Sequence, residues 1–158
     1  MKNLWAPWRM EYILSEKEPY CIFCVKPSEK NDRDNLILFR GKEAFIIMNK
    51  YPYNNGHLMV VPYFHTSGLE DIKESTLSEM MMLTRYSTAC LKKAFNPEGF
   101  NVGINIGGVA GAGIKEHIHI HVVPRWAGDS NFMAVTGELR VIPEHLLETY
   151  DKLVRFFN

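Results

Sequence analysis

The sequence has no excess of either charge, no long apolar run and only three cysteines among its 158 residues. Lys plus Arg number 18, as do Asp plus Glu, so no bulk charge favours nucleic acid or an anionic membrane as a partner. No apolar stretch is long enough for a transmembrane helix, and the first residues lack the apolar core of a signal peptide. An odd number of cysteines gives no disulfide framework, and we therefore expect a cytoplasmic protein.

The composition is that of a globular domain, with 46% hydrophobic and 23% charged residues. A chain of this length can bury one sizeable core but is short for two ordinary domains. We expect a single domain over 1–158. It divides into an N-terminal segment (1–35), a sheet with a long helix (36–142) and a C-terminal helix (143–158).

Apolar runs bounded by turn residues predict an antiparallel sheet. Residues 35–49 are expected to form a β-hairpin around Gly41, and three more strands are expected at 54–62, 99–107 and 116–124. Hairpins beside helices are typical of an α+β domain, here with about five strands.

Helical periodicity predicts two helices that accompany this sheet. The longer one covers 75–95, where Thr76 and Glu79 fit a capping box and Pro97 follows the end. The other is the C-terminal helix at 143–158.

Three histidines alternate with apolar residues in the stretch "KEHIHIHVVPRW". In a strand, His117, His119 and His121 would share one face. The opposite face, which can enter the core, would carry Ile118, Ile120 and Val122. The histidine face has three interpretations: a solvated polar surface, a metal site, or covalent catalysis by one imidazole whose neighbour fixes its tautomer.

A loop with five glycines between Gly103 and Gly113 precedes the histidines. Such a loop is either a flexible connection or a concavity of backbone N–H groups that binds phosphate oxygens. Its position directly before a histidine face favours phosphate. A catalytic metal would require carboxylates near the motif, and only Glu116 and Asp129 flank it, with Glu116 expected to point away.

The pair Cys21 and Cys24 in "CIFC" has the spacing of metal ligands but makes only half of a zinc site. A redox pair is a second interpretation, although no βαβ pattern surrounds it. Two buried bystander cysteines are the third.

The motif "HIHIHVV" resembles that of the histidine triad (HIT) family, in which three histidines alternate with apolar residues. The resemblance covers nearly the whole chain and is closest to the diadenosine tetraphosphate phosphorylase-like branch. It includes "LWAPWRMEYI", "CIFC", "YPYNNGHLMVVPYFH", "GFNVGINIGGVAGAGIKEHIHIHVVPRW" and "GDSNFM". It implies a single HIT domain, a homodimer and no organic cofactor. The implied activity is nucleotidyl transfer or hydrolysis at the α-phosphate of dinucleoside polyphosphates.

The same resemblance assigns roles to individual residues. His119 matches the nucleophile that forms a nucleotidyl-imidazole intermediate, and His121 matches a hydrogen-bond donor near the phosphate and leaving group. The positions that match substrate-binding residues are Asn49 (ribose), Asn105 (phosphate side), Gly111 and Gly113 (amide-donating loop). The loop departs from the family pattern, with one extra residue and no hydroxyl residue at its end.

The resemblance also implies a structural zinc ion held by Cys21, Cys24, His65 and His117, which would tether residues 1–35 to the catalytic strand. Four protein ligands leave no open position on the metal. The branch favours phosphorolysis, which yields a nucleoside diphosphate. A hydrolase that yields a monophosphate and a nucleotide sensor with little turnover are the alternatives.

Overall fold

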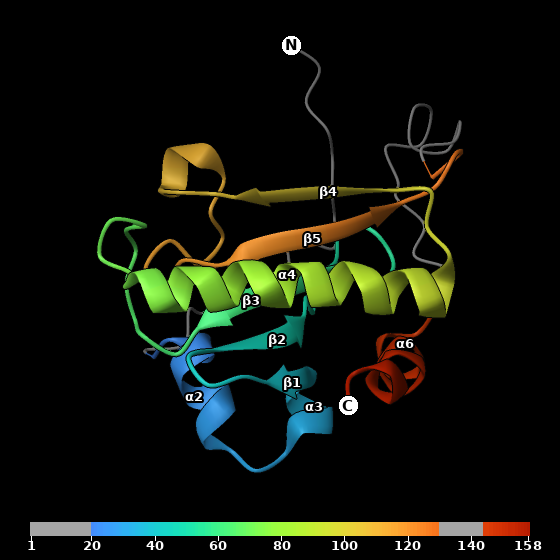
Figure 1. The fold of residues 1–158 in the computed structure, drawn as a ribbon, viewed down its shortest axis with the longest axis horizontal. Helices are drawn as coiled ribbons and strands as arrows, with labels where there is room; N and C mark the ends of the chain where they lie inside the picture. The colour runs from blue at the N-terminus through green and yellow to red at the C-terminus, as the bar shows by residue number, and fades with distance from the viewer. Residues whose placement is uncertain (1–19, 130–143) are drawn as a thin grey trace.

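Five antiparallel strands in the order β1-β2-β3-β5-β4 form the frame of the computed structural model, which describes residues 20–129 and 144–158 (Figure 1). The strands are β1 (Ile37–Arg40), β2 (Ala44–Met48), β3 (Leu58–Pro62), β4 (Gly99–Ile104) and β5 (Ile120–Arg125). The predicted α+β class and the antiparallel sheet are confirmed.

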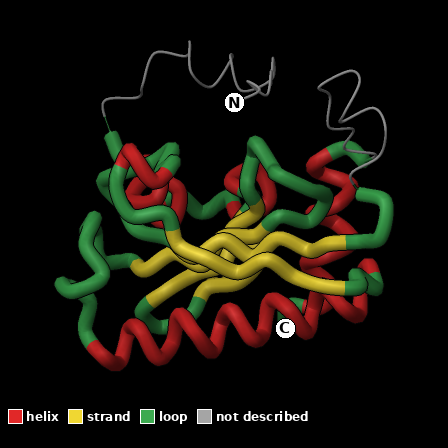
Figure 2. The backbone as a smooth tube through the Cα atoms, turned by 90° about the horizontal axis from the view of Figure 1, so that it is seen from above, coloured by secondary structure: helices red, strands yellow, loops and turns green. Residues whose placement is uncertain are grey.

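The long helix α4 (Glu74–Phe95) runs across one face of the sheet, and Figure 2 shows it on the side opposite most loops. The shorter helices are α2 (Ile22–Ser28), α3 (Asp32–Asn35), α6 (Leu146–Leu153) and the 3₁₀ turns η1 (Gly108–Ala110) and η2 (Val154–Phe156). The C-terminal helix therefore begins later than the predicted residue 143, which lies outside the described residues. None of the described helices is long and apolar enough to cross a membrane.

Register divides the sheet into two faces. Ile46, Val60 and Ile120 lie opposite one another, and the next position brings Met59 opposite His121. Directly opposed residues project to the same face of a sheet. The aromatic ring of Phe23 in α2 packs on the rings of His117 and His119, so α2 covers part of the histidine face while α4 covers the other.

The predicted capping box of α4 is wrong. The Thr76 hydroxyl donates instead to the Glu43 carboxylate at 2.8 Å. The Glu79 carboxylate accepts the backbone N–H groups of Lys42 at 2.6 Å and Glu43 at 3.0 Å, in the turn between β1 and β2. A side chain at Gly41 would collide with this carboxylate. Both residues thus tie the helix to the hairpin. Glu79 satisfies amide donors of the turn that have no ladder partner, and Thr76 donates to a carboxylate of the same turn.

Three predicted strands are shorter than expected, and one of them is β4, which ends at Ile104 instead of residue 107. The other two, β5 and β3, begin late. β5 begins at Ile120, so His117 and His119 precede the ladder, with a bend at His117. β3 begins at Leu58, and residues 54–57 form a turn in which the His57 N–H donates to the Asn54 carbonyl at 3.2 Å. Both changes place histidines at strand ends, where side chains are less constrained by the pleat.

Candidate functional site

Strand register gathers four polar residues from different elements on the histidine face. His121 lies opposite Met59 and Gly103, and Asn105, two residues beyond Gly103 and directly after the end of β4, has the alternation of the same face. The Asn49 N–H donates to the His57 carbonyl at 3.0 Å, which continues the pairing of β2 with β3 beyond their ends. Asn49, His57, His121 and Asn105 therefore project to one side of the sheet.

His119 has a fixed tautomer. Its Nδ1–H donates to the backbone carbonyl of His117 at 2.9 Å, so Nε2 carries the free lone pair. The ring is 4% exposed, and burial lowers the pKa of His119 below its usual value. A neutral imidazole with an available Nε2 is the form that can attack an electrophile at neutral pH.

His57 extends the site through a chain of hydrogen bonds. Its Nδ1 accepts from the Tyr53 N–H at 3.0 Å, with the Asn49 amide at 3.4 Å. The proton of His57 must therefore lie on Nε2, which donates to Nδ1 of His121 at 2.9 Å. His121 is left with its own proton on Nε2 and presents a hydrogen-bond donor to the site.

Burial keeps this chain uncharged. Desolvation, followed by the neighbouring His121 and His119, lowers the pKa of His57 to about 3. Desolvation and His119 lower the pKa of His121 to about 4. The rings of His119 and His121 lie 4.7 Å apart, edge to face. At neutral pH the site thus pairs an Nε2 lone pair on His119 with an Nε2–H donor on His121.

His57 was not among the site residues predicted from the sequence. Its partner His121 is 64 residues away, and no local pattern indicates that pairing. The available signal was the alternation of side chains along a strand. His57 is two residues before Met59 and shares its face, and Met59 pairs with His121. His57 is 1% exposed, and a buried imidazole requires partners for its nitrogens.

The glycine loop is open, but part of its backbone is already hydrogen bonded. Gly107 and Gly111 have φ of 83° and 87°, a left-handed conformation that suits glycine. The Gly111 N–H donates to the Gly108 carbonyl at 3.1 Å. Phosphate binding by Gly111 and Gly113 stays a prediction, and for Gly111 it requires this turn to rearrange. Next to the loop, a Cβ at Gly103 would meet nothing within 4 Å, so space remains beside His121.

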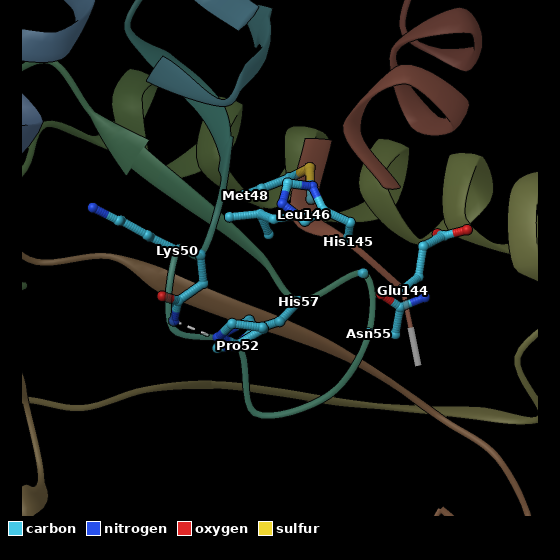
Figure 3. A pocket seen from close by; sticks show the side chains of 10 residues that line it. Met48, Lys50, Pro52, Asn55, His57, Glu144, His145 and Leu146 are labelled. Atoms are coloured by element: carbon cyan, nitrogen blue, oxygen red, sulfur yellow. Dashed lines mark hydrogen bonds between the residues drawn. The ribbon is translucent and has the colours of Figure 1, made fainter. Parts of the chain in front are cut away.

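A cavity of about 280 Å³ adjoins this chain of histidines. Figure 3 shows Lys50, Pro52 and His57 on one wall, and Glu144, His145 and Leu146 from the start of α6 on the other. Asn49, the predicted ribose ligand, also lines the cavity. Its Oδ1 accepts from the Tyr51 N–H at 2.9 Å, which directs its amide toward His57.

The predicted metal ligands come together at the opposite end of the motif. One ligand atom from each of Cys21, Cys24, His65 and His117 lies within 4.8 Å of the others. Sγ of Cys21 is 3.2 Å from Nδ1 of His117, and Sγ of Cys24 is 3.3 Å from Nδ1 of His65. Tetrahedral zinc with bonds of about 2.0–2.3 Å would hold its ligand atoms roughly 3.5 Å apart.

Tautomer and ligand chemistry also fit a metal ion. Nε2–H of His117 donates to the Pro62 carbonyl at 2.8 Å, so Nδ1 presents its lone pair toward the cysteines. A ligand histidine typically donates its other N–H to such a partner. Two thiolates with two imidazoles form a set that zinc prefers, and these four residues could supply all four ligands of a tetrahedral ion.

Comparisons with known proteins identify the family of this chain. A model of the HIT domain matches residues 30–128. The AP-4-A phosphorylase of Mycobacterium tuberculosis is 41% identical over 158 residues, covering 94% of this chain and 80% of that protein. A bis(5'-nucleosyl)-tetraphosphatase (asymmetrical) of Schizosaccharomyces pombe is 29% identical over 93 residues, covering 59% of this chain and 50% of that protein.

Among solved structures, a zinc-bound histidine triad family protein of Mycobacterium smegmatis superposes with a TM-score of 0.70 at 26% identity. The match covers 86% of this chain and 91% of the other. The domain model spans more than half of the sequence, and the triad has the alternation that first suggested the resemblance. This chain belongs to the histidine triad (HIT) family.

Proposed function

We propose that this protein transfers a nucleotidyl group from dinucleoside polyphosphates, with diadenosine tetraphosphate as the model substrate, through a nucleotidyl-His119 intermediate. The carrying observation is the fixed tautomer of His119, whose Nδ1–H is bound by the His117 carbonyl so that Nε2 is free. The relative named AP-4-A phosphorylase supports this substrate class.

In the first step, Nε2 of His119 forms a bond to the α-phosphorus while the bond from that phosphorus to the bridging oxygen breaks. The Nε2–H of His121 donates a hydrogen bond to the oxygen on which charge develops. The leaving group departs as a nucleoside polyphosphate. Because the neutral His121 is a donor without a net charge, it stabilises the leaving oxygen by orientation rather than by ion pairing.

In the second step, an oxygen of inorganic phosphate attacks the intermediate and the phosphorus–nitrogen bond breaks, giving a nucleoside diphosphate. Water in place of phosphate would give a monophosphate, and the tetraphosphatase relative makes hydrolysis the second candidate. We assign ribose binding to Asn49, phosphate binding to Asn105, and amide donation to Gly111 and Gly113. The position of Asn105 directly after β4, whose Gly103 pairs with His121, supports its part in this assignment.

We further assign a structural zinc ion to Cys21, Cys24, His65 and His117. The closeness of their ligand atoms supports this, as does the tautomer of His117. The ion would fix α2, and with it Phe23, against the rings of His117 and the catalytic His119. No step of the reaction passes through this site, because its four positions are all protein ligands.

The proposed assembly is a cytoplasmic homodimer. β4 is an edge strand of the sheet, and its Val102 is 48% exposed. An edge with unpaired N–H and C=O groups can pair with the same edge of a second copy.

Product analysis tests the proposed function. The zinc-replete protein is incubated with diadenosine tetraphosphate, with and without inorganic phosphate, and the products are identified by mass spectrometry. Phosphorolysis yields ADP and ATP only when phosphate is present. AMP and ATP in both samples would establish hydrolysis instead, and saturable binding without products would establish a sensor.

A further inference from the structure

The turn that supplies the Tyr53 N–H is attached to the far end of β5 through one buried side chain. Asn54 is 8% exposed, and its Nδ2 donates to the Pro124 carbonyl at 3.1 Å and to Oδ2 of Asp129 at 2.8 Å. Its Oδ1 accepts from the Asn55 N–H at 3.1 Å. Every polar atom of this amide group is thus used to hold the turn.

Asp129 in turn is held by three other donors. Its carboxylate accepts from Nε of Arg125 at 2.6 Å and Nη2 at 2.8 Å, and from the Trp126 N–H at 3.2 Å. This paired geometry fixes the plane of the carboxylate, which makes it a rigid acceptor for Asn54. We call Asn54, Asp129 and Arg125 the Asn54 clamp.

The geometry assigns a function to the Asn54 clamp: it positions the Tyr53 N–H so that His57 is held in its Nε2–H tautomer, and thereby makes His121 a donor toward the substrate. Tyr53 immediately precedes Asn54, and the His57 N–H bonds to the Asn54 carbonyl at 3.2 Å. Asn54, which the clamp holds, therefore lies in the chain between Tyr53 and His57, the donor and the acceptor of the N–H···Nδ1 hydrogen bond.

The direction of the whole hydrogen-bond chain depends chiefly on this backbone donor, which is the closer of the two that reach Nδ1 of His57. If the Tyr53 N–H moved away, the His57 proton could occupy Nδ1, and Nε2 of His57 would then accept from Nδ1–H of His121. His121 would present a lone pair to the phosphate instead of a donor. The Asn49 amide, 3.4 Å from Nδ1 of His57, is the longer of the two contacts and belongs to the residue that we assign to ribose.

The clamp residues act through His57, so they are positioning residues rather than catalytic residues. Their effect on turnover rests on the proposed function, but their effect on the tautomer does not. The tautomer can be measured in the free protein by long-range ¹H–¹⁵N correlation of labelled histidine, without any substrate. The two inferences can therefore fail separately.

The experiment compares wild-type protein with Asp129→Asn and Asn54→Ala, and uses Asn101→Ala as the matched control. Asn101 accepts from Nη1 of the same Arg125 at 2.7 Å but is exposed, and the Asn54 side chain is hydrogen bonded to other residues. In the wild type and the control, His57 is expected entirely as Nε2–H. In the clamp variants a Nδ1–H population is expected, and kcat should fall on the order of tenfold with little change in KM.

Three results would overturn the inference. The first is wild-type His57 protonated on Nδ1, which decides the matter even if both variants fail to fold. The second is a folded Asp129→Asn or Asn54→Ala protein whose His57 keeps a pure Nε2–H signal. The third is an equal change of tautomer in Asn101→Ala. Absence of turnover in wild-type protein would refute the proposed function alone and leave the tautomer result standing.

Discussion

His57, His119 and His121 have the same side chain but different chemical roles, because their ring nitrogens meet different partners. The Nδ1–H of His119 donates to a carbonyl, which leaves the lone pair of Nε2 free. A backbone N–H donates to Nδ1 of His57, so Nε2–H of His57 donates to Nδ1 of His121 and leaves the His121 proton on Nε2. Burial lowers the pKa of all three and removes the charged form that would block these roles.

Replacing the nucleophile should abolish turnover without unfolding the protein. In His119→Asn we expect a rate lower by at least about a thousandfold, because the covalent step has no substitute group. Acid quench with substrate labelled at the α-phosphate should trap label on the wild type and not on the variant. Circular dichroism and the melting temperature serve as folding controls, and a variant that keeps several per cent of the wild-type rate would exclude His119 as the covalent centre.

The buried His57 should make the fold sensitive to mild acid. Its pKa is lowered to about 3, so between about pH 6.5 and 3 the unfolded chain binds a proton that the folded chain does not. Stability is then full above pH 6.5 and falls as pH decreases, by about 1.4 kcal/mol per pH unit for this one group.

Urea unfolding at several pH values checks this linkage in wild type and His57→Gln. The slope of the unfolding free energy between pH 6 and pH 4 should be smaller in the variant by about one proton. Identical slopes would show that His57 does not titrate on unfolding. Because the two proteins share every other titrating group, the difference between their pH slopes reports on His57.

At the scale of elements, the sequence predicted what local patterns control. Strands such as 44–48 and 58–62 are buried on both faces, so their sequences are apolar throughout. Such a continuous apolar run can be recognised in the sequence. Thr76 and Glu79 match a capping signature, but that signature records only spacing, and the β1–β2 turn offers better partners for both. His57 and the Asn54 clamp were missed because their partners are 64 to 75 residues distant.

Loss of the Glu79 carboxylate should loosen the contact between α4 and the β1–β2 hairpin. Glu79→Gln keeps one acceptor for two backbone donors and removes the charge, so we expect the free energy of unfolding to decrease by about 1–3 kcal/mol. Glu74→Gln, on the exposed first turn of the same helix, is the matched control and should change it by less than about 0.5 kcal/mol. Equal effects at both positions would assign the loss to the helix dipole instead.

At the scale of the whole molecule, the proposed zinc ion should contribute folding free energy. We expect about one zinc per chain by elemental analysis, and Cys24→Ser should release it with a lower melting temperature, because ligands collected from three regions lose their link. The control is Cys90→Ala, a buried cysteine whose Sγ contacts the Phe156 carbonyl, which should keep its zinc. Wild-type protein purified without chelators and free of zinc would contradict the assignment.

The sheet has two edges, and they differ in their ability to join a second copy. β1 has four residues, an irregular register between Ile37 and Phe39, and a neighbouring helix α3. β4 has six residues in regular register with β5, and its side chains are half-buried or exposed. Irregular, short or covered edges resist pairing, whereas a regular exposed edge permits it. A dimer is therefore expected through β4.

Val102→Lys should separate such a dimer. Val102 is 48% exposed at the middle of β4, and two copies related by a two-fold axis would bring two added ammonium groups close together. Light scattering coupled to size-exclusion chromatography should give a dimer for the wild type and a monomer for the variant at equal concentration. Val109→Lys, in the exposed turn η1 outside β4, adds the same charge and should remain a dimer. If Val102→Lys also stays dimeric, the contact between subunits lies elsewhere on the surface, because a buried, unpaired lysine at the centre of an interface is strongly destabilising.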